Sequence, residues 1–173
     1  NKSAAEKYVL IYAHAHDLRS SVIRLSNVYG PRASIHSPDF TFNNYFIGLA
    51  LQNREIMVFG DGAQKRNVVY VDDAVEALVA AADSERSNGE TFLAVGDEHY
   101  SVAEIAEMTV KIMGRGRIRF VPWPQERKVT EVGDAIISNR KIKETLAWAP
   151  CTIMPDGLAR TRDYYLGCME KYT

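Results

Sequence analysis

The sequence predicts an α/β protein that forms part of a larger sheet. Short apolar runs alternate with amphipathic helical patterns along the 173 residues, as in α/β proteins. Few of these runs suit central strands, and a buried parallel strand needs neighbours on both sides. Because an open sheet edge is normally paired or covered, we expect further strands outside this sequence.

Composition limits the classes of partner. Hydrophobic residues make up 46% and charged residues 25%, which indicates one globular unit over residues 1–173. A net charge of -1 argues against the broad basic surface that nucleic acid requires. No apolar run is long enough to span a bilayer, and no signal peptide is visible. The two cysteines, Cys151 and Cys168, lack metal-ligand spacing. We therefore expect a reduced, cytoplasmic protein without a metal site, a nucleic-acid partner or a membrane partner.

The individual elements follow from periodicity and from turn residues. Tyr8, Ile11, Tyr12 and Ala15 recur at helical spacing and predict a helix over residues 3–16. The apolar run at 21–26 suits a buried strand, which residues 27–32 end in a turn or loop. The later elements expected are a helix near 41–53, a strand at 56–59 stopped by Gly60-Asp61-Gly62, an extended segment at 68–71, a helix at 73–83 capped by Asp72, a strand at 91–95, a helix from the Ser101–Glu104 capping box to Met113, a strand at 118–121, and helices at 138–148 and 155–170.

Candidate ligand contacts begin with Lys2 and Asn27. Lys2 starts the first helix, where a solvated lysine is the simpler interpretation. Asn27 follows a strand end, where α/β proteins bind their ligands, and its amide offers both a donor and an acceptor. A turn residue that satisfies local backbone groups explains Asn27 equally well.

Two arginines and one aromatic residue are candidates for binding a phosphorylated ligand. The turn at 60–62 is too short to cradle phosphate itself, but it places Arg66, and a guanidinium can hold phosphate through two parallel hydrogen bonds. Arg127 could pair with it on a diphosphate. The sequence alone is equally consistent with two surface arginines that form weak ion pairs. It is also consistent with Phe59 either as a core residue or as a residue that stacks on a ligand.

In their order along the chain, the segments that carry these residues resemble a known family. They resemble the second half of the extended short-chain dehydrogenase/reductase family, in its nucleotide-sugar epimerase/dehydratase branch. This resemblance covers almost the whole chain. It implies a partial Rossmann-type sheet plus a small α/β substrate-binding subdomain, with NAD as cofactor and a nucleotide-diphosphate sugar as substrate. The matching segments are residues 2–8, 24–32, 59–73, 126–127, 138–141 and 146–150.

The resemblance also implies roles near the cofactor. Lys2 corresponds to the catalytic, ribose-binding lysine of a Tyr-x-x-x-Lys pair, whose tyrosine would precede Asn1. Val28 and Tyr29 would lie near the nicotinamide, although Tyr29 could equally be structural. The helix over 3–16 resembles the family's dimer helix, so we expect a homodimer or self-association through it.

Substrate contacts are implied for Asn27, Phe59, Arg66 and Arg127. The arginines would clamp the diphosphate and Phe59 would stack on the base. The chain departs from the family pattern at three further positions: Asn67 replaces a usual Asp, Ala94 a frequent Asn, and Ala147 a common Gly.

The expected function is that of a portion of an enzyme. The Gly-rich dinucleotide-binding turn is absent, so we expect the chain alone to be incompetent for catalysis and to bind NAD weakly or not at all. The full-length parent enzyme would be an isomerase or a lyase, and the sequence does not distinguish an epimerase from a dehydratase. The alternative is a stand-alone, non-catalytic nucleotide-sugar-binding or interaction module, and the codons upstream of Asn1 distinguish the two.

Overall fold

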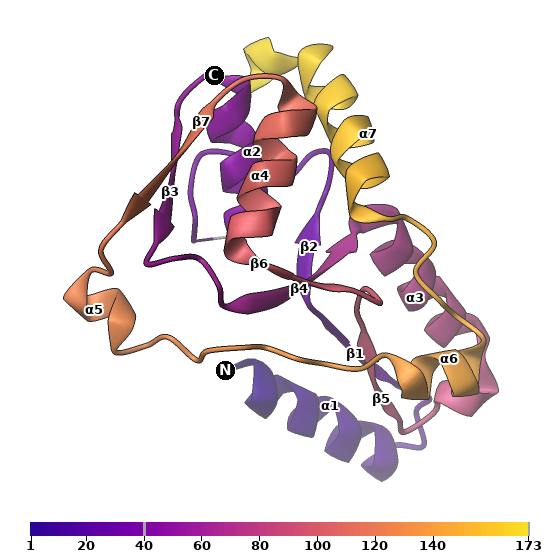
Figure 1. Cartoon of the computed structure of the whole chain (residues 1–173). Coiled ribbons are helices and arrows are strands. Elements are labelled where there is room, and N and C mark those ends of the chain that lie inside the picture. Colours follow the sequence, from indigo (N-terminus) through magenta and orange to yellow (C-terminus); the bar gives the residue numbers. More distant parts are fainter. Residues whose placement is uncertain (40, 173) are drawn as a thin grey trace.

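A computed structural model describes residues 1–39 and 41–172 of the chain (Figure 1). Its helices are α1 (Lys2–Ala15), α2 (Phe42–Leu51), α3 (Val71–Asp83), α4 (Val102–Met113), α5 (Gln125–Lys128), α6 (Arg140–Leu146) and α7 (Met154–Leu166), with short 3-10 turns at Glu85–Ser87 and Met169–Lys171. Its strands are β1 (Val22–Leu25), β2 (Asn27–Tyr29), β3 (Glu55–Phe59), β4 (Lys65–Tyr70), β5 (Thr91–Ala94), β6 (His99–Ser101) and β7 (Arg117–Val121). None of the helices described is long and apolar enough to cross a membrane.

The strands form three small sheets rather than one large one. Parallel pairing joins β1 to β5, β2 to β4 and β3 to β7, and β6 adds to β4 in the antiparallel direction. The predicted α/β class is therefore confirmed. Residues 27–29 were expected in a turn or loop, and this is wrong, because they form β2 beside the buried strand β4. The short strand β6 was not predicted.

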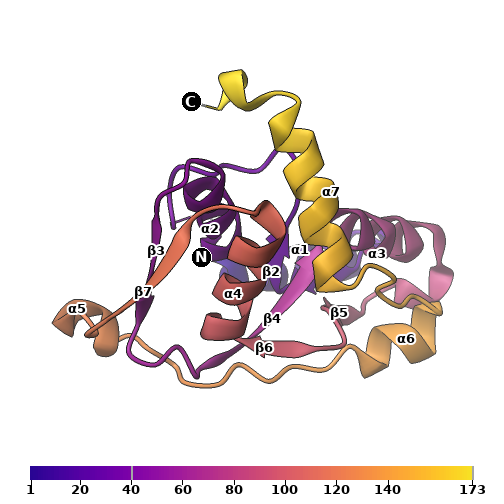
Figure 2. The same ribbon diagram turned by 45° about the horizontal axis from the view of Figure 1, so that its top comes forward.

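The larger core surrounds helix α4. This helix contacts α2 on one side and α7 on the other (Figure 2). Its start is the predicted capping box, in which Ser101 and Glu104 satisfy each other's backbone N–H groups, and it ends at Gly114. At Gly157, a Cβ would lie 2.2 Å from the Tyr29 hydroxyl, so glycine lets α7 approach β2 closely.

A second core packs α3 and α6 against β5. Phe92 and Ile142 are fully buried there, and the Trp148 indole N–H donates to the Asp73 carbonyl over 3.1 Å. The expectation that Asp72 caps α3 is wrong. Tyr70 occupies the N-cap position without a side-chain hydrogen bond, and Asp72 is exposed.

The amino-terminal elements are the least covered. Strand β1 was expected to be buried, but Arg24 and Leu25 are exposed because β5 is its one partner among the described strands. On α1, Ala13 is the one residue buried. The Arg24 guanidinium donates to the Glu6 carboxylate at 2.6 Å and so ties β1 to α1. Among the described strands, one edge of β1 has no partner, as the sequence predicted.

Ala147 ends α6 in a strained backbone conformation. This residue lies in the left-handed region with φ 54°, and it is exposed. An L-residue is strained there whereas glycine is not, so we expect Ala147→Gly to raise the free energy of unfolding by about 1 kcal/mol. Urea unfolding measures the change. The same substitution at Ala149, which is also exposed but has no positive φ, is the control, and an equal effect there would contradict the explanation.

Candidate functional site

Three of the residues predicted to bind substrate line one cavity. The cavity measures about 370 Å³ and lies between α2, β3 and the segment that contains α5. Phe59, Arg66 and Arg127 all contribute to its lining, although they come from separate parts of the chain. The structure thus brings together the aromatic residue and the two arginines. Their binding of a ligand stays a prediction.

Aromatic side chains form a wall of the same cavity. Phe42, Tyr45 and Phe46 contribute from α2, because positions three and four apart share one helix face. Phe59 pairs with Trp123, with ring centroids 5.4 Å apart. Trp123 was missed by the sequence analysis, although its place between Pro122 and Pro124, just after β7, was the available signal.

The Gly60–Gly62 turn shapes this wall. Gly60 has φ 64°, and a Cβ there would lie 2.5 Å from the Trp123 indole nitrogen. Gly62 also has positive φ, and the chain then enters β4 one residue before Arg66. The predicted tight turn is confirmed. Its glycines allow the backbone to reverse and let Trp123 lie against it.

Arg66 is held in a fixed position inside the cavity. Its guanidinium donates to the Gly133 carbonyl at 2.6 Å, to the Lys65 carbonyl at 2.8 Å and to a Glu131 carboxylate oxygen at 2.6 Å. The Arg66 side chain is only 16% exposed. Arg127 lies on α5 and is exposed, and within the described part of the chain its side chain forms no ion pair. The cavity therefore has one anchored cation and one accessible cation.

Asn27, Val28 and Tyr29 lie apart from this cavity. The Asn27 amide donates to the Asn67 carbonyl at 2.9 Å, which accounts for it as a backbone-satisfying residue of β2. The Tyr29 ring is 1% exposed and packs edge-on against Tyr70, and its hydroxyl donates to the Met154 carbonyl. Burial raises the pKa of Tyr29, so the phenol stays protonated. Tyr29 also borders a separate cavity of about 180 Å³.

Lys2 is exposed at the start of α1 and does not line the cavity that holds Arg66. In Figure 1, α1 lies below the loop that joins α5 to α6, whereas α2 and β3 lie above it. The structure therefore does not gather Lys2 and Arg66 into one site within the described residues.

The departure at Asn67 has a physical reason in this chain. Its side chain is 1% exposed, accepts from the Gly96 N–H at 2.9 Å and donates to the carbonyls of Gly96 and Glu98. A carboxylate could not donate to two carbonyls, whereas an amide does both. Asn67 therefore fixes the loop after β5 to β4. The structure gives Ala94 no such role, since it is a fully buried core residue.

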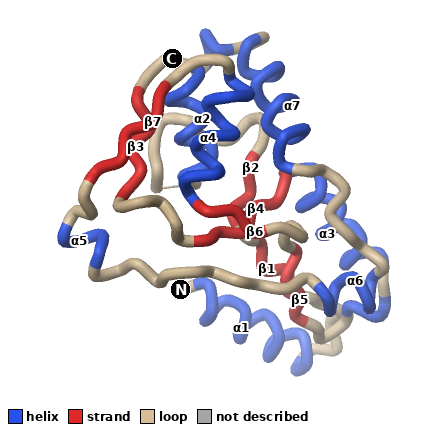
Figure 3. Tube along the Cα trace, in the orientation of Figure 1, coloured by secondary structure: helices blue, strands red, loops and turns tan. Residues whose placement is uncertain are grey.

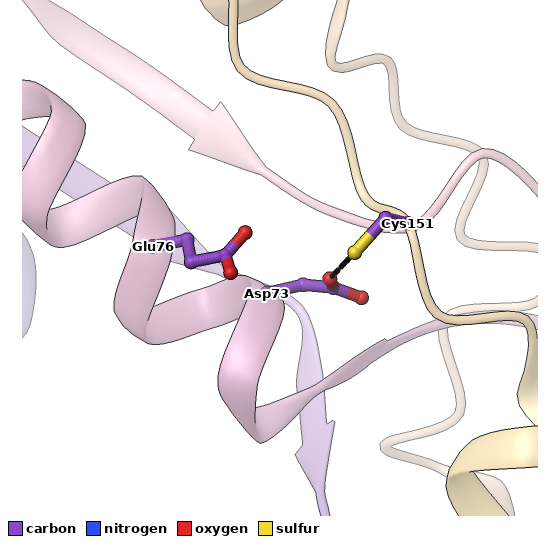
Figure 4. Close-up of side chains that lie close together, drawn as sticks. All are labelled: Asp73, Glu76 and Cys151. Atoms are coloured by element: carbon purple, nitrogen blue, oxygen red, sulfur yellow. Dashed lines mark hydrogen bonds between the residues drawn. The ribbon is translucent and has the colours of Figure 1, made fainter.

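Asp73, Glu76 and Cys151 form a further cluster of polar side chains (Figure 4). The buried Asp73 carboxylate accepts from the N–H groups of Cys151 and Thr152, each at 3.1 Å, and from the Cys151 thiol. The hydrogen bond to Asp73 and the charge of Asp73 raise the pKa of Cys151, which disfavours the thiolate. These hydrogen bonds occupy both carboxylate oxygens of Asp73. The cluster is therefore explained as a structural link between α3 and the segment before α7.

The chain is an α/β protein with Rossmann-type parallel strands and a cavity that combines arginines with aromatic side chains. The family model for "NAD dependent epimerase/dehydratase family" matches residues 1–102. The chain belongs to this family, and the resemblance inferred from the sequence is confirmed.

Individual relatives agree with this assignment. A UDP-N-acetyl-alpha-D-glucosaminuronate decarboxylase from Bacillus cytotoxicus is 34% identical over 170 residues, which cover 95% of this chain and 51% of the relative. The UDP-glucose 4-epimerase of Thermotoga maritima, solved with UDP-glucose, superposes with a TM-score of 0.85 at 28% identity, over 97% of this chain and 52% of that one. Pal from Bacillus thuringiensis gives a TM-score of 0.84 at 30% identity, over 96% of this chain and 51% of that one. The chain spans about half the length of the curated relatives it matches.

Proposed function

We propose that this chain is the carboxyl-terminal, substrate-binding portion of an NAD-dependent nucleotide-sugar epimerase or dehydratase. The observation that supports this proposal best is the cavity that combines Arg66 and Arg127 with the rings of Phe59 and Trp123. Two arginines suit a diphosphate, and an aromatic wall suits a nucleotide base. Relatives named for UDP- and dTDP-sugars are consistent with this ligand class.

We also propose that the chain alone binds NAD weakly or not at all and does not catalyse the conversion of a nucleotide sugar. A dinucleotide pyrophosphate is held by a Gly-rich turn between a parallel strand and a helix. In the described residues, β4 leads directly into α3 and β6 directly into α4, Pro122-Trp123-Pro124 joins β7 to α5, and the connection from β2 to α2 contains one glycine, Gly30. None of these strand-to-helix connections is Gly-rich, so none of them offers the turn that holds the pyrophosphate of NAD. When NAD is bound by the family's other half, it would supply hydride transfer.

Calorimetric titration tests this function. We expect UDP-glucose or dTDP-glucose to bind weakly but measurably, and NAD to give no saturable heat. Comparison of the two sugar nucleotides reports the base preference of the aromatic wall. NAD binding tighter than that of both sugar nucleotides, or no binding of either sugar nucleotide, would contradict the proposal.

Self-association through α1 is a separate proposal. Tyr8, Ile11 and Tyr12 are 75%, 67% and 61% exposed on one face of this helix, and a contiguous apolar surface favours association. We expect the mass measured by light scattering to rise with protein concentration, and Ile11→Lys to abolish the rise. Leu166→Lys changes an exposed leucine of α7 in the same way and is the control. A monomeric wild-type chain at high concentration would refute this proposal.

A further inference from the structure

The segment between α5 and α6 crosses the molecule without helix or strand. We name residues 129–138 the strap; it is drawn as a tan loop in Figure 3. Hydrogen bonds fasten it to the start of β4, because the Ala135 N–H donates to the Lys65 carbonyl at 3.0 Å and the Lys65 N–H donates to Asp134 at 2.8 Å. The strap thus forms one side of the cavity that holds Arg66.

The strap presents two acceptors to the Arg66 guanidinium. A Glu131 carboxylate oxygen lies 2.6 Å from one terminal nitrogen, and the Gly133 carbonyl lies 2.6 Å from the other. The same Glu131 oxygen accepts from the Gly133 N–H at 2.9 Å, which fixes the carboxylate in place. The side chains of Arg66 and Glu131 are 16% and 22% exposed, so bulk solvent screens this pair only partly.

These acceptors occupy the positions that phosphate oxygens need. A guanidinium binds an oxyanion through parallel N–H donors, and both terminal nitrogens of Arg66 already donate to the strap. A diphosphate carries more negative charge than one carboxylate and competes for the same donors. It cannot enter beside Glu131 without like-charge repulsion.

We propose that Glu131 is an internal substitute for phosphate on Arg66, and that a nucleoside diphosphate binds by displacing it and releasing residues 131–135 of the strap from β4. This inference rests on the proposed function of the cavity. While Glu131 holds Arg66, the site does not bind a diphosphate. The measured affinity for the diphosphate is therefore the affinity of the released site multiplied by the fraction of molecules in which Arg66 is released. Glu131 therefore sets both the affinity of the site and the position of the strap.

The test compares Glu131→Gln with Glu126→Gln, using UDP and inorganic pyrophosphate as probes. Both substitutions remove one negative charge, but Glu126 is exposed on α5, does not line the cavity and is not among the hydrogen-bond partners of Arg66. A neutral amide forms a weaker hydrogen bond to Arg66 than a carboxylate does. We expect Glu131→Gln to bind both probes about fivefold to tenfold more tightly than wild type, and Glu126→Gln to change affinity much less.

Hydrogen exchange by mass spectrometry supplies the second measurement. We expect saturation with UDP to speed exchange in residues 131–135 of the wild-type chain, and Glu131→Gln to show fast exchange there without ligand. If Glu131→Gln melts far below wild type, Glu131→Asp, whose shorter side chain reaches Arg66 less well, replaces it and is expected to tighten binding in the same direction.

The possible results distinguish a failure of this inference from a failure of the proposed function of the cavity. Wild-type binding of UDP together with equal affinities for Glu131→Gln and Glu126→Gln would overturn the role of Glu131 and leave the nucleotide site standing. Unchanged exchange in residues 131–135 on saturation would overturn the release of the strap. Failure of both the wild-type chain and Glu131→Gln to bind either probe would overturn the inference and the proposed function together.

Discussion

Arg66→Ala is expected to weaken the binding of UDP about tenfold to a hundredfold. A hydrogen bond to a charged group contributes about 1.5–3 kcal/mol, and 1.4 kcal/mol corresponds to a factor of ten in affinity. The substitution removes the guanidinium that is proposed to bind the phosphates and also leaves the Glu131 carboxylate without its cation. Calorimetry or a chemical-shift titration measures the ratio of dissociation constants.

Two further variants identify which property of Arg66 matters. Arg66→Lys keeps the charge but loses the forked donors, so we expect an intermediate affinity. Arg54→Ala removes the same charge from an exposed arginine that does not line the cavity, and we expect it to bind UDP as wild type does. Equal affinities for Arg66→Ala and Arg54→Ala would show that Arg66 does not contact the ligand.

The largest effect on stability is expected at Asp73. Its carboxylate is 1% exposed and accepts from the N–H groups of Cys151 and Thr152, so it holds the segment before α7 against the start of α3. Asp73→Ala removes both acceptors, and we expect the free energy of unfolding to fall by about 2–3 kcal/mol. Urea unfolding at neutral pH measures the loss.

Asp72→Ala is the matched control for this prediction. Asp72 lies in the same first turn of α3, carries the same charge and is exposed, so the loss of its interaction with the helix dipole is expected to cost about 0.3–1 kcal/mol. If Asp73→Ala destabilised the chain by no more than the about 0.3–1 kcal/mol expected for Asp72→Ala, the hydrogen bonds of Asp73 would not stabilise the contact between α3 and the segment before α7.

The sequence predicted the elements whose signals are local. The capping box at Ser101 and the glycine stop at Gly114 depend on neighbouring residues, and both are confirmed. Residues 27–29 were assigned to a turn or loop, yet pairing with the buried strand β4 makes them a strand. That pairing joins residues about forty positions apart, and local composition carries no signal for it.

In the candidate site, too, the sequence identified some residues and missed others. Family resemblance pointed to Phe59, Arg66 and Arg127, and the structure places them around one cavity. The partner of Arg66 was not predicted, because Glu131 lies sixty-five positions later in a segment without periodicity. The structural role of Asp73 was not predicted either, because its partners, Cys151 and Thr152, lie after α6. Contacts between distant loops depend on tertiary packing that pattern analysis does not reach.

The position of a bound diphosphate tests the central claim most directly. A crystal structure of the chain grown with UDP should place phosphate oxygens within about 3 Å of the Arg66 guanidinium, with the uracil ring against Phe59 and Glu131 withdrawn from Arg66. A diphosphate located instead in the cavity beside Tyr29, with Arg66 still paired to Glu131, would contradict the account.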